Sequence, residues 1–424
     1  MINTITNLNG IVLVVMTLLY IYQYVYVIIG LINRNKKQVE EDAPFHRYAV
    51  LVSARNEESV IGELVACLKK QKYPEDKYDV FVLADNCTDA TAEIAKKAGA
   101  IVYERWNSQL VGKGYALDFL IKEIKRDYEK YDAYLVFDAD NLVDEMFIAE
   151  MNKTFDKGYD AVTSYRNSKN FGTNWISAAY SIWFLREARF LNYPRMLLNT
   201  NCHISGTGFC ISDAVIEENG GWPFHLLTED IQFSVECACK GKKIGYCDKA
   251  IVYDEQPVTF EQSWNQRMRW TKGFYQVNVK YMLSLIKGIF TSKNRKFSCY
   301  DMMMTTAPGN LLTLSFIAFN AIMMFVAKNQ PYYIANVVNA RCGQFIINTL
   351  IFFYVGLLIY GVITVASEWN SIKASNAKKI AYVFLFPVFQ ATYFPIAIIA
   401  LFKKVDWKPI KHFSTDKYAL EAKN

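Results

Sequence analysis

Residues 133–141 read AYLVFDADN, an apolar run that closes on two acidic side chains, Asp138 and Asp140. A short apolar run bounded by turn-forming residues predicts a buried strand. Carboxylates at i and i+2 just past such a strand project their oxygens into one small space, where they can hold a divalent cation. A cation there would take up the charge that develops on a diphosphate leaving group. An ordinary acidic turn is the alternative interpretation of this pair on its own.

Four further strand-like runs surround this one and alternate with helical stretches between residues 48 and 250. They are YAVLVSA at 48–54, YDVFVLAD at 78–85, AIVYE at 100–104 and DAVTSY at 160–165. Such alternation predicts an α/β domain, expected over residues 44–275, whose mostly parallel sheet carries helices on both faces. Ligands of these sheets bind at the carboxyl ends of the strands, and two of these ends are acidic, at Asp85 and Asp138.

Apolar sequence flanks this domain. The 424-residue chain is 52% hydrophobic and 15% aromatic, which is more apolar than most soluble domains. Residues 8–32 carry no charge and can cross a bilayer, which takes about 20 apolar residues. Because no basic segment precedes this run and no small-residue cleavage site follows it, we expect a retained anchor over residues 1–37. The net charge of +6 gathers beside apolar runs, which favours membrane flanks over nucleic-acid binding.

The C-terminal part of the chain is apolar again and predicts further membrane segments. Residues 276–300 include an amphipathic stretch with lysines on one side, which we expect to lie in the membrane interface. A membrane region is expected over residues 301–404. Within it, the runs at 302–326 and 345–366 are long enough to span a bilayer.

The last apolar run, at 380–402, contains Pro387 and Pro395, so we expect it to be kinked, re-entrant or split. The positive-inside rule places the α/β domain in the cytoplasm, since the first apolar run is followed by Arg34, Lys36 and Lys37. Three full spans after the domain would put the tail, residues 405–424, on the outside. Lysines around the start of the tail favour the inside, so we expect a non-spanning last segment and a cytoplasmic tail.

Three further groups of polar residues are candidates for chemistry. The Asp85 carboxylate can accept the imide N–H of a uracil. Lys113 lies between two glycines that let the backbone come close, so its ammonium can meet a phosphate; a solvated loop lysine is the alternative. Glu229 or Asp230, in LLTEDIQFSV, can take a proton from an acceptor hydroxyl, although the same residues also suit an ordinary helix start.

Two motifs suggest contacts with a sugar. Gln266, Arg269 and Trp270, in WNQRMRW, fall at i, i+3 and i+4 and so share one helical face. Arg269 can hold a diphosphate with two hydrogen bonds, and Trp270 can lie under a sugar ring. A basic amphipathic segment that meets lipid headgroups is the alternative. The loop SGTGFCIS at 205–212 is small enough to lie against a sugar or phosphate, and it could equally be a plain turn.

Taken in order, these pieces resemble the family 2 inverting glycosyltransferases of the GT-A fold, a Rossmann-like α/β domain. Within that family the chain is most similar to membrane-bound synthases of hyaluronan, cellulose and poly-N-acetylglucosamine. The resemblance extends over residues 48–272. It is carried by the ordered set SARNEE, ADNCTDAT, GKGYAL, FDAD, SGTG, TED and QRMRW.

The resemblance implies roles for individual residues. It implies Asp230 as the general base, with Glu229 beside it in the catalytic pair, and Mn²⁺ or Mg²⁺ on the metal ligands Asp138 and Asp140. Nucleotide-sugar binding is implied for Ser53, Arg55, Glu57, Asp85, Lys113, Asp138, Gln266 and Arg269. Acceptor binding is implied for Gly206, Thr207, Gly208 and Trp270. The family usually has two aspartates where this chain has Ala84 and Asp85, which weakens the argument for uracil.

The resemblance also implies an activity. We expect a processive enzyme at the cytoplasmic membrane face that polymerises a β-linked polysaccharide from a UDP-sugar of the glucose or N-acetylglucosamine type. The growing chain and the lipid bilayer are the other expected partners, with no nucleic acid, and export through the enzyme's own transmembrane region is expected. The alternative is a single-addition transferase that acts on a lipid-linked acceptor. A transporter or a sensor that binds the nucleotide-sugar without turnover is a weaker alternative.

Overall fold

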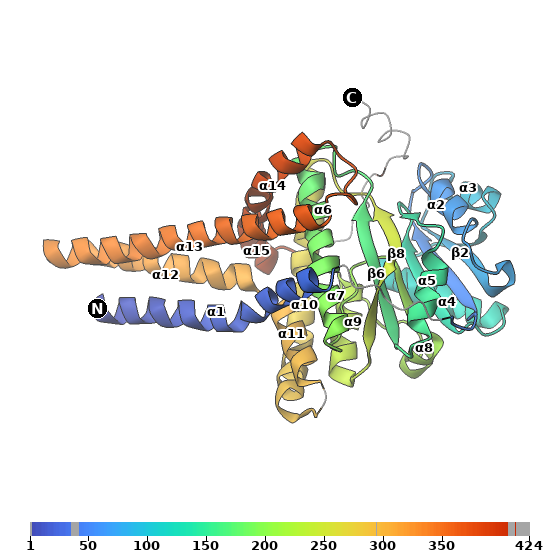
Figure 1. Cartoon of the computed structure of the whole chain (residues 1–424), viewed down its shortest axis with the longest axis horizontal. Coiled ribbons are helices and arrows are strands. Elements are labelled where there is room, and N and C mark those ends of the chain that lie inside the picture. The colour runs from blue at the N-terminus through green and yellow to red at the C-terminus, as the bar shows by residue number, and fades with distance from the viewer. Residues whose placement is uncertain (1, 35–41, 294, 406–411, 413–424) are drawn as a thin grey trace.

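The computed structural model describes residues 2–34, 42–293, 295–405 and 412 (Figure 1). An eight-stranded sheet in the order β3-β2-β1-β4-β7-β6-β8-β5 forms the centre of the domain that follows the first helix, α1 Ile2–Ile32. Its strands are β1 Tyr48–Ala54, β2 Tyr78–Asp85, β3 Ile101–Arg105, β4 Ala133–Asp138, β5 Leu142–Val143, β6 Ala161–Ser168, β7 Phe209–Ser212 and β8 Ile244–Asp254. The predicted α/β domain of GT-A type, flanked by apolar helices, is therefore confirmed.

The sheet is mixed rather than mostly parallel. Strands β3, β2, β1 and β4 are parallel, and the register pairs Ser53 with Asp138 at their carboxyl ends. Strand β7 is antiparallel to both β4 and β6, and β5 is antiparallel to β8. Sequence reasoning took the region of β7 as a loop, because four residues directly after two glycines give too short a pattern to predict a strand.

Helices cover both faces of the sheet because the strand residues alternate between two cores. Leu51 of β1 packs into one apolar cluster, whereas Val50 and Val52 pack into the other. The covering elements are α2 Ile61–Leu68, η1 Glu75–Lys77, α3 Thr91–Lys97, α4 Lys113–Asp127, α5 Phe147–Phe155, α6 Trp175–Glu187, the π-helix η2 Ala188–Asn192, α7 Tyr193–Leu197, α8 Asp213–Asn219 and α9 Glu229–Lys240. The carboxyl ends of the parallel strands remain free to form a site.

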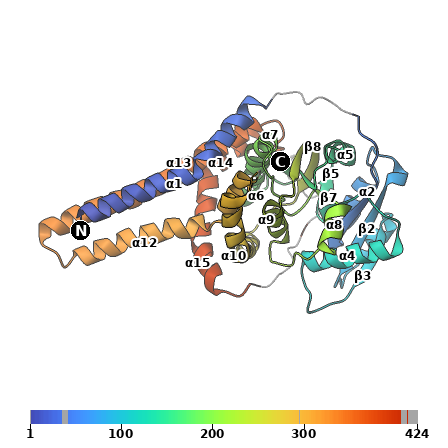
Figure 2. The same cartoon turned by 90° about the horizontal axis from the view of Figure 1, so that it is seen from below.

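Within the described residues, four helical segments are long and apolar enough to cross a membrane: Ile2–Ile32, Gly309–Ala327, Tyr332–Ser367 and Asn376–Phe402. Three of them, α1, α12 and α13, project together away from the sheet domain (Figures 1 and 2). Their far ends pack on one another, because Asn9 of α1 exchanges hydrogen bonds of 2.8 and 3.0 Å with Asn320 of α12. An apolar cluster that includes Ile5, Ala327 and Val338 adjoins this pair.

The fourth segment differs from the other three. It is divided into α14 Asn376–Ala391 and α15 Tyr393–Phe402, and Figure 2 shows α15 running across the base of the projecting helices. In its most apolar stretch 39% of the residues are buried within the protein, against 6–11% in the other three. The fully buried Arg267 donates to Phe389 O (3.3 Å) and to Thr392 Oγ1 at the break. The split predicted from the two prolines is thus present.

The predicted interfacial segment, residues 276–300, belongs to two helices. Helix α10 runs from Phe260 to Thr291 without a break at residue 275, and α11 runs from Lys296 to Thr306. The span predicted at 302–326 is shorter than expected, because Pro308 separates α11 from α12. Exposed apolar side chains line α10 at Val279, Leu283, Ile286 and Phe290.

Candidate active site

One cavity of about 570 Å³ connects the strand ends with the projecting helices. Its sheet end is lined by residues that follow β1, β2 and β4, including Arg55, Asp85 and Asp138. Its membrane end is lined by residues of α1, α11, α12 and α13, including Asn310 and Tyr360. The predicted nucleotide-sugar residues all line this cavity: Ser53, Arg55, Glu57, Asp85, Lys113, Asp138, Gln266 and Arg269.

Asp85 is the last residue of β2 and lines the sheet end of the cavity. Its Oδ1 accepts a hydrogen bond of 3.0 Å from Arg105 Nη1, and both side chains are almost fully buried. Burial raises the pKa of Asp85 above its ordinary value, although the Arg105 and Arg55 charges act in the opposite direction. Arg105 thus fixes this carboxylate in place.

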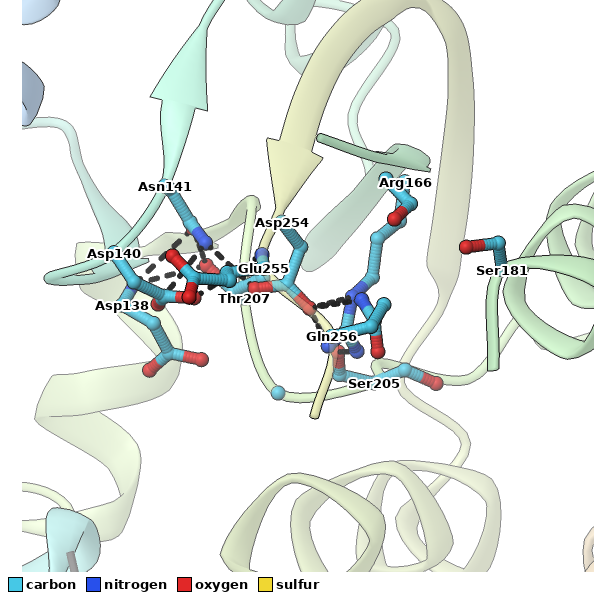
Figure 3. A network of polar contacts seen from close by, with 12 residues as sticks. Asp138, Asp140, Asn141, Arg166, Ser181, Ser205, Thr207, Asp254, Glu255 and Gln256 are labelled. Atoms are coloured by element: carbon cyan, nitrogen blue, oxygen red, sulfur yellow. Dashed lines mark hydrogen bonds and ion pairs between the residues drawn. The ribbon is translucent and has the colours of Figure 1, made fainter. Parts of the chain in front are cut away.

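The DxD carboxylates belong to a larger acidic group (Figure 3). Asp140 is 5% exposed, and its Oδ2 accepts from Glu255 N at 3.1 Å. Burial raises the pKa of Asp140 to about 8, and the neighbouring Asp254 and Asp138 add to the rise. Asp254 is held by Arg166 Nε at 3.0 Å and by Asn141 Nδ2 at 2.9 Å.

The carboxylate oxygens of this group lie close together, and a hard divalent cation bound among them would offset their mutual repulsion. Within the described residues, however, no three acidic, histidine or cysteine side chains are already arranged around one point. The Asp138 carboxylate instead accepts from Lys113 Nζ. These carboxylates are therefore suitable ligands for a divalent cation. To bind one, the Asp138 carboxylate would give up its hydrogen bond from Lys113.

Lys113, at the start of α4, connects the two acidic parts of the site. Its Nζ donates to Asp138 and, at 2.6 Å, to Gly206 O. Although burial lowers the pKa of this lysine, the charges of Asp138, Glu229 and Asp230 raise it above the ordinary value. Lys113 is thus a fixed positive charge between the DxD pair and the TED acids, where a diphosphate would lie.

His412, the described residue of the tail, also reaches the sheet end of the cavity. Its Nδ1 lies 2.9 and 3.0 Å from the two Glu57 carboxylate oxygens, and its Nε2 lies 3.9 Å from Asp140 Oδ2. Ser59 Oγ donates to the His412 carbonyl oxygen at 3.1 Å. Sequence reasoning did not find this contact, because 355 positions separate His412 from Glu57. The rest of the predicted tail, 406–411 and 413–424, lies outside the described residues.

The TED acids begin α9 on the opposite side of Lys113. Burial and the adjacent Asp230 raise the pKa of Glu229 to about 7. Burial also raises the pKa of Asp230, while hydrogen bonds from the N–H groups of Ile231 and Gly206 and the charge of Lys113 lower it. Thr228 is the N-cap residue by position, but its side chain makes no capping hydrogen bond.

The SGTG loop divides between the cavity and the sheet. Ser205 and Gly206 line the cavity. Thr207 is 2% exposed and lies under the DxD pair, where its hydroxyl accepts from Asp138 N at 2.9 Å. Gly208 has a φ of +65°, and a Cβ there would lie 2.4 Å from Ser164 Oγ. Of the four predicted acceptor-binding residues, Gly206 and Trp270 therefore face the cavity, and Thr207 and Gly208 support its floor.

The QRMRW motif presents one face of α10 to the cavity, as the helical spacing predicts. Gln266, Arg269 and Trp270 line the cavity, and Trp270 packs edge-to-face on Tyr180 and Phe184. Among the described residues, Gln266 Oε1 is buried with no hydrogen-bond partner, so it is free to receive a donor from a ligand.

Sequence reasoning missed several further polar residues that line the cavity, among them Arg166, Glu187, His203 and Asp254. A signal existed for Asp254, because an apolar run ends on this acid as another does on Asp138. No motif marks Glu187 or His203, which reach the cavity only through the packing of α6 against the glycine loop.

The cavity, with the Lys113 ammonium between two acidic groups and an end that opens toward the apolar helices, has the charges that a nucleotide-sugar transferase requires. A family model described as "Glycosyltransferase like family 2" matches residues 46–273, more than half of the chain. The chain therefore belongs to that family and is a glycosyltransferase.

Several curated proteins are similar to this chain. A probable glycosyltransferase, YdaM, of Bacillus subtilis is 26% identical over 57% of this chain and 58% of its own length. A beta-monoglucosyldiacylglycerol synthase of Nostoc is 25% identical over 70% of this chain and 62% of its own. The poly-beta-1,6-N-acetyl-D-glucosamine synthase of Staphylococcus aureus is 25% identical over 60% of this chain and 59% of its own. The matches thus cover about three fifths of these relatives' own lengths.

Solved structures with a similar arrangement share little sequence with the chain. The mannosyltransferase PcManGT of Pyrobaculum calidifontis, in complex with GDP-Man and Mn²⁺, is 15% identical, with a TM-score of 0.47 over 82% of this chain and 99% of its own. Residues 1–349 of S. aureus TarS, in complex with UDP-GlcNAc, are 16% identical, with a TM-score of 0.44 over 82% of this chain and 92% of that one.

Proposed function

We propose that this enzyme transfers a hexose of the glucose or N-acetylglucosamine type from its UDP derivative, with inversion, onto a growing β-linked glycan at the cytoplasmic membrane face. The observation that carries the proposal is the single cavity that joins the nucleotide end of the sheet to the membrane helices. The donor and acceptor can then approach Lys113 and Asp230 from opposite ends. The poly-N-acetylglucosamine synthase among the relatives supports the same activity.

The donor end supplies fixed charge. Asp85, supported by Arg105, can receive the uracil imide, while Lys113 and Arg269 can face the diphosphate. Asp140, together with Asp138, would hold Mn²⁺ or Mg²⁺, which when bound offsets charge on the leaving group. Asp230 would take the proton of the acceptor hydroxyl as that hydroxyl attacks the anomeric carbon from the side opposite the diphosphate.

The acceptor end suits sugar rings. Its lining combines polar groups with aromatic side chains, namely Tyr20, Trp183, Phe184, Trp270, Phe274 and Tyr360. Flat aromatic faces with hydrogen-bonding groups at their edges can hold successive sugars of a polymer. This composition favours repeated addition to a retained chain.

The same arrangement supports the proposed membrane topology. If α1, α12 and α13 span the bilayer and α14–α15 lies at its surface, the tail returns to the side of the catalytic domain. His412 fits this topology, because it contacts Glu57 within that domain. The basic residues after α1 favour the cytoplasm as this side of the membrane.

A single addition to a lipid-borne hydroxyl is the second candidate, and a specific observation favours it. The outer ends of the three projecting helices are packed through the Asn9–Asn320 pair, and the membrane end of the cavity includes the apolar Met304, Phe353 and Leu357. Because the outer ends of these helices are packed against one another, we do not propose that the product leaves the membrane between them. The Nostoc relative is named for a glucosyldiacylglycerol product.

The experiment that tests the proposal is a donor screen on purified protein in nanodiscs. UDP-glucose and UDP-N-acetylglucosamine are supplied separately with Mn²⁺ or Mg²⁺, and UDP release and product length are both measured. A long β-linked product from one donor, absent in Asp140→Asn, is expected. UDP release with only a lipid-linked monosaccharide would establish the second candidate, and no UDP release from either donor would refute the proposal.

A further inference from the structure

A buried acid–histidine pair lies on the cavity wall outside the family motifs. Glu187 ends α6, and His203 precedes the glycine loop, with Nε2 of His203 3.1 Å from Glu187 Oε2. Glu187 is 9% exposed and His203 4%, yet both line the same cavity as Asp230. Burying such groups costs free energy unless close partners compensate, so their position at the cavity points to a ligand.

The partners of His203 determine where its proton lies. Arg195 Nη1 contacts His203 Nδ1, and a guanidinium has hydrogen-bond donors only. Nδ1 must therefore accept, which leaves the hydrogen on Nε2, facing Glu187. Arg195 is fixed in turn by Asp301 of α11, through hydrogen bonds of 2.7 and 2.8 Å. A chain of three buried side chains thus holds Glu187 in place from the membrane side.

Glu187 retains capacity for further hydrogen bonds. It accepts from Ser205 Oγ and from His203, whereas a carboxylate offers about four acceptor positions. Although burial raises its pKa, His203, Ser205 and the Arg166 charge together hold the pKa of Glu187 below the ordinary value. The group is therefore ionised at neutral pH, and an ionised carboxylate forms short, strong hydrogen bonds with hydroxyls.

The adjacent residues Ser205 and Gly206 connect this pair to the proposed base, Asp230. Ser205, which donates to Glu187, is followed by Gly206, whose N–H contributes to fixing Asp230. Two hydroxyls of one sugar ring can therefore be recognised together, the attacking one by Asp230 and another by Glu187. We infer that Glu187 binds a hydroxyl of the acceptor sugar ring, with His203 and Arg195 as its positioning residues.

This inference rests on the proposed transferase function and specifies its acceptor. A carboxylate with free lone pairs recognises a polyhydroxylated ring, such as the terminal sugar of a glycan. An isolated lipid hydroxyl, once engaged by Asp230, would leave Glu187 without a partner. The acceptor class assigned here is therefore a sugar ring.

The test measures binding of a β-linked tetrasaccharide, of glucose or of N-acetylglucosamine, to the full-length protein in nanodiscs with UDP and Mn²⁺ present. Glu187→Gln is expected to weaken tetrasaccharide binding about tenfold, since the acceptor loses the negative charge that strengthens its hydrogen bonds, while the affinity for UDP stays the same. Glu150→Gln, which changes a carboxylate paired with Lys153 on α5, is the matched control and should leave both affinities unchanged.

Two variants of His203 test the positioning role. Glutamine can still accept from Arg195 and donate to Glu187, so His203→Gln should bind the tetrasaccharide within about threefold of wild type. His203→Leu removes both hydrogen bonds and should weaken binding as Glu187→Gln does. Unchanged tetrasaccharide affinity in Glu187→Gln, or no tetrasaccharide binding by a wild-type protein that binds UDP, would overturn the inference. Loss of UDP binding by the wild type would instead refute the proposed function.

Discussion

Replacing Asp230 by asparagine separates the general base from the rest of the site. The substitution keeps the size of the side chain and leaves Lys113, Asp138 and Asp140 in place to bind the donor. General-base catalysis contributes about 10²–10⁴-fold, so the barrier should rise by about 3–5 kcal/mol. UDP release during polymerisation should fall by this factor, while the dissociation constant for UDP changes less than about twofold.

The pH dependence gives a second measure of the same residue. A base acts in its ionised form, so the wild-type turnover number should fall as the pH falls through the pKa of Asp230. Because burial raises this pKa above that of an ordinary aspartate, the decrease should appear at a higher pH than a free carboxylate would give. Asp230→Asn should lose this limb of the profile.

Glu229→Gln is the control for the neighbouring acid. Burial and Asp230 raise the pKa of Glu229 to about 7, so part of this group is already protonated at neutral pH. We expect Glu229→Gln to lose less than about tenfold in turnover. A kinetic assay of UDP release in nanodiscs, from pH 5 to 9, measures both variants. If Asp230→Asn kept more than a tenth of the wild-type turnover, the assignment of the base would be wrong.

Three further predictions follow from single contacts. Asp140→Asn should raise the Mn²⁺ concentration for half-maximal activity about tenfold or more, measured by metal titration after chelation, and an unchanged value would exclude Asp140 as a ligand. Gly208→Ala should lower the melting temperature in detergent, because the new Cβ would lie 2.4 Å from Ser164 Oγ. Gly158 has a similar positive φ but open space around it, so Gly158→Ala is the control and should lower the melting temperature less. Arg195→Met should destabilise the protein by about 3–5 kcal/mol, since the fully buried Asp301 carboxylate loses the counter-charge of Arg195 and keeps the hydroxyls of Tyr22 and Tyr26, and adding Asp301→Asn should recover part of that loss in a chemical-denaturation series.

Local sequence patterns predicted the parallel half of the fold well. The runs over 48–54 and 78–85 are strands with those same limits, because a continuous apolar pattern ending in a polar residue is a local property. The part of the sheet that contains antiparallel pairs was predicted only in part, since the run at 160–165 falls in β6 but β7 was not expected. Strand β7 has four residues, and its pairing with β4 and β6 depends on contacts that no local pattern records.

The candidate site divides along similar lines. Residues at strand ends or on a helical face, such as Asp138 and Trp270, could be brought together from spacing alone. Glu187, His203 and His412 could not, since each reaches the cavity through packing between distant segments. For His203 even the position of the hydrogen depends on Arg195.

Helix α10 explains how the site is aligned with the membrane. Its 32 residues form one rigid rod about 48 Å long. One face carries Gln266, Arg269 and Trp270, which line the cavity, and an adjoining face carries Arg267, which donates to Thr392 at the break between α14 and α15. Gly273 lets the same rod approach the TED segment, because a Cβ there would lie 2.6 Å from the side chain of Thr228. A single helix therefore contacts the TED segment at Thr228, the cavity and the break between α14 and α15, so under the proposed function it would align an entering acceptor with Asp230.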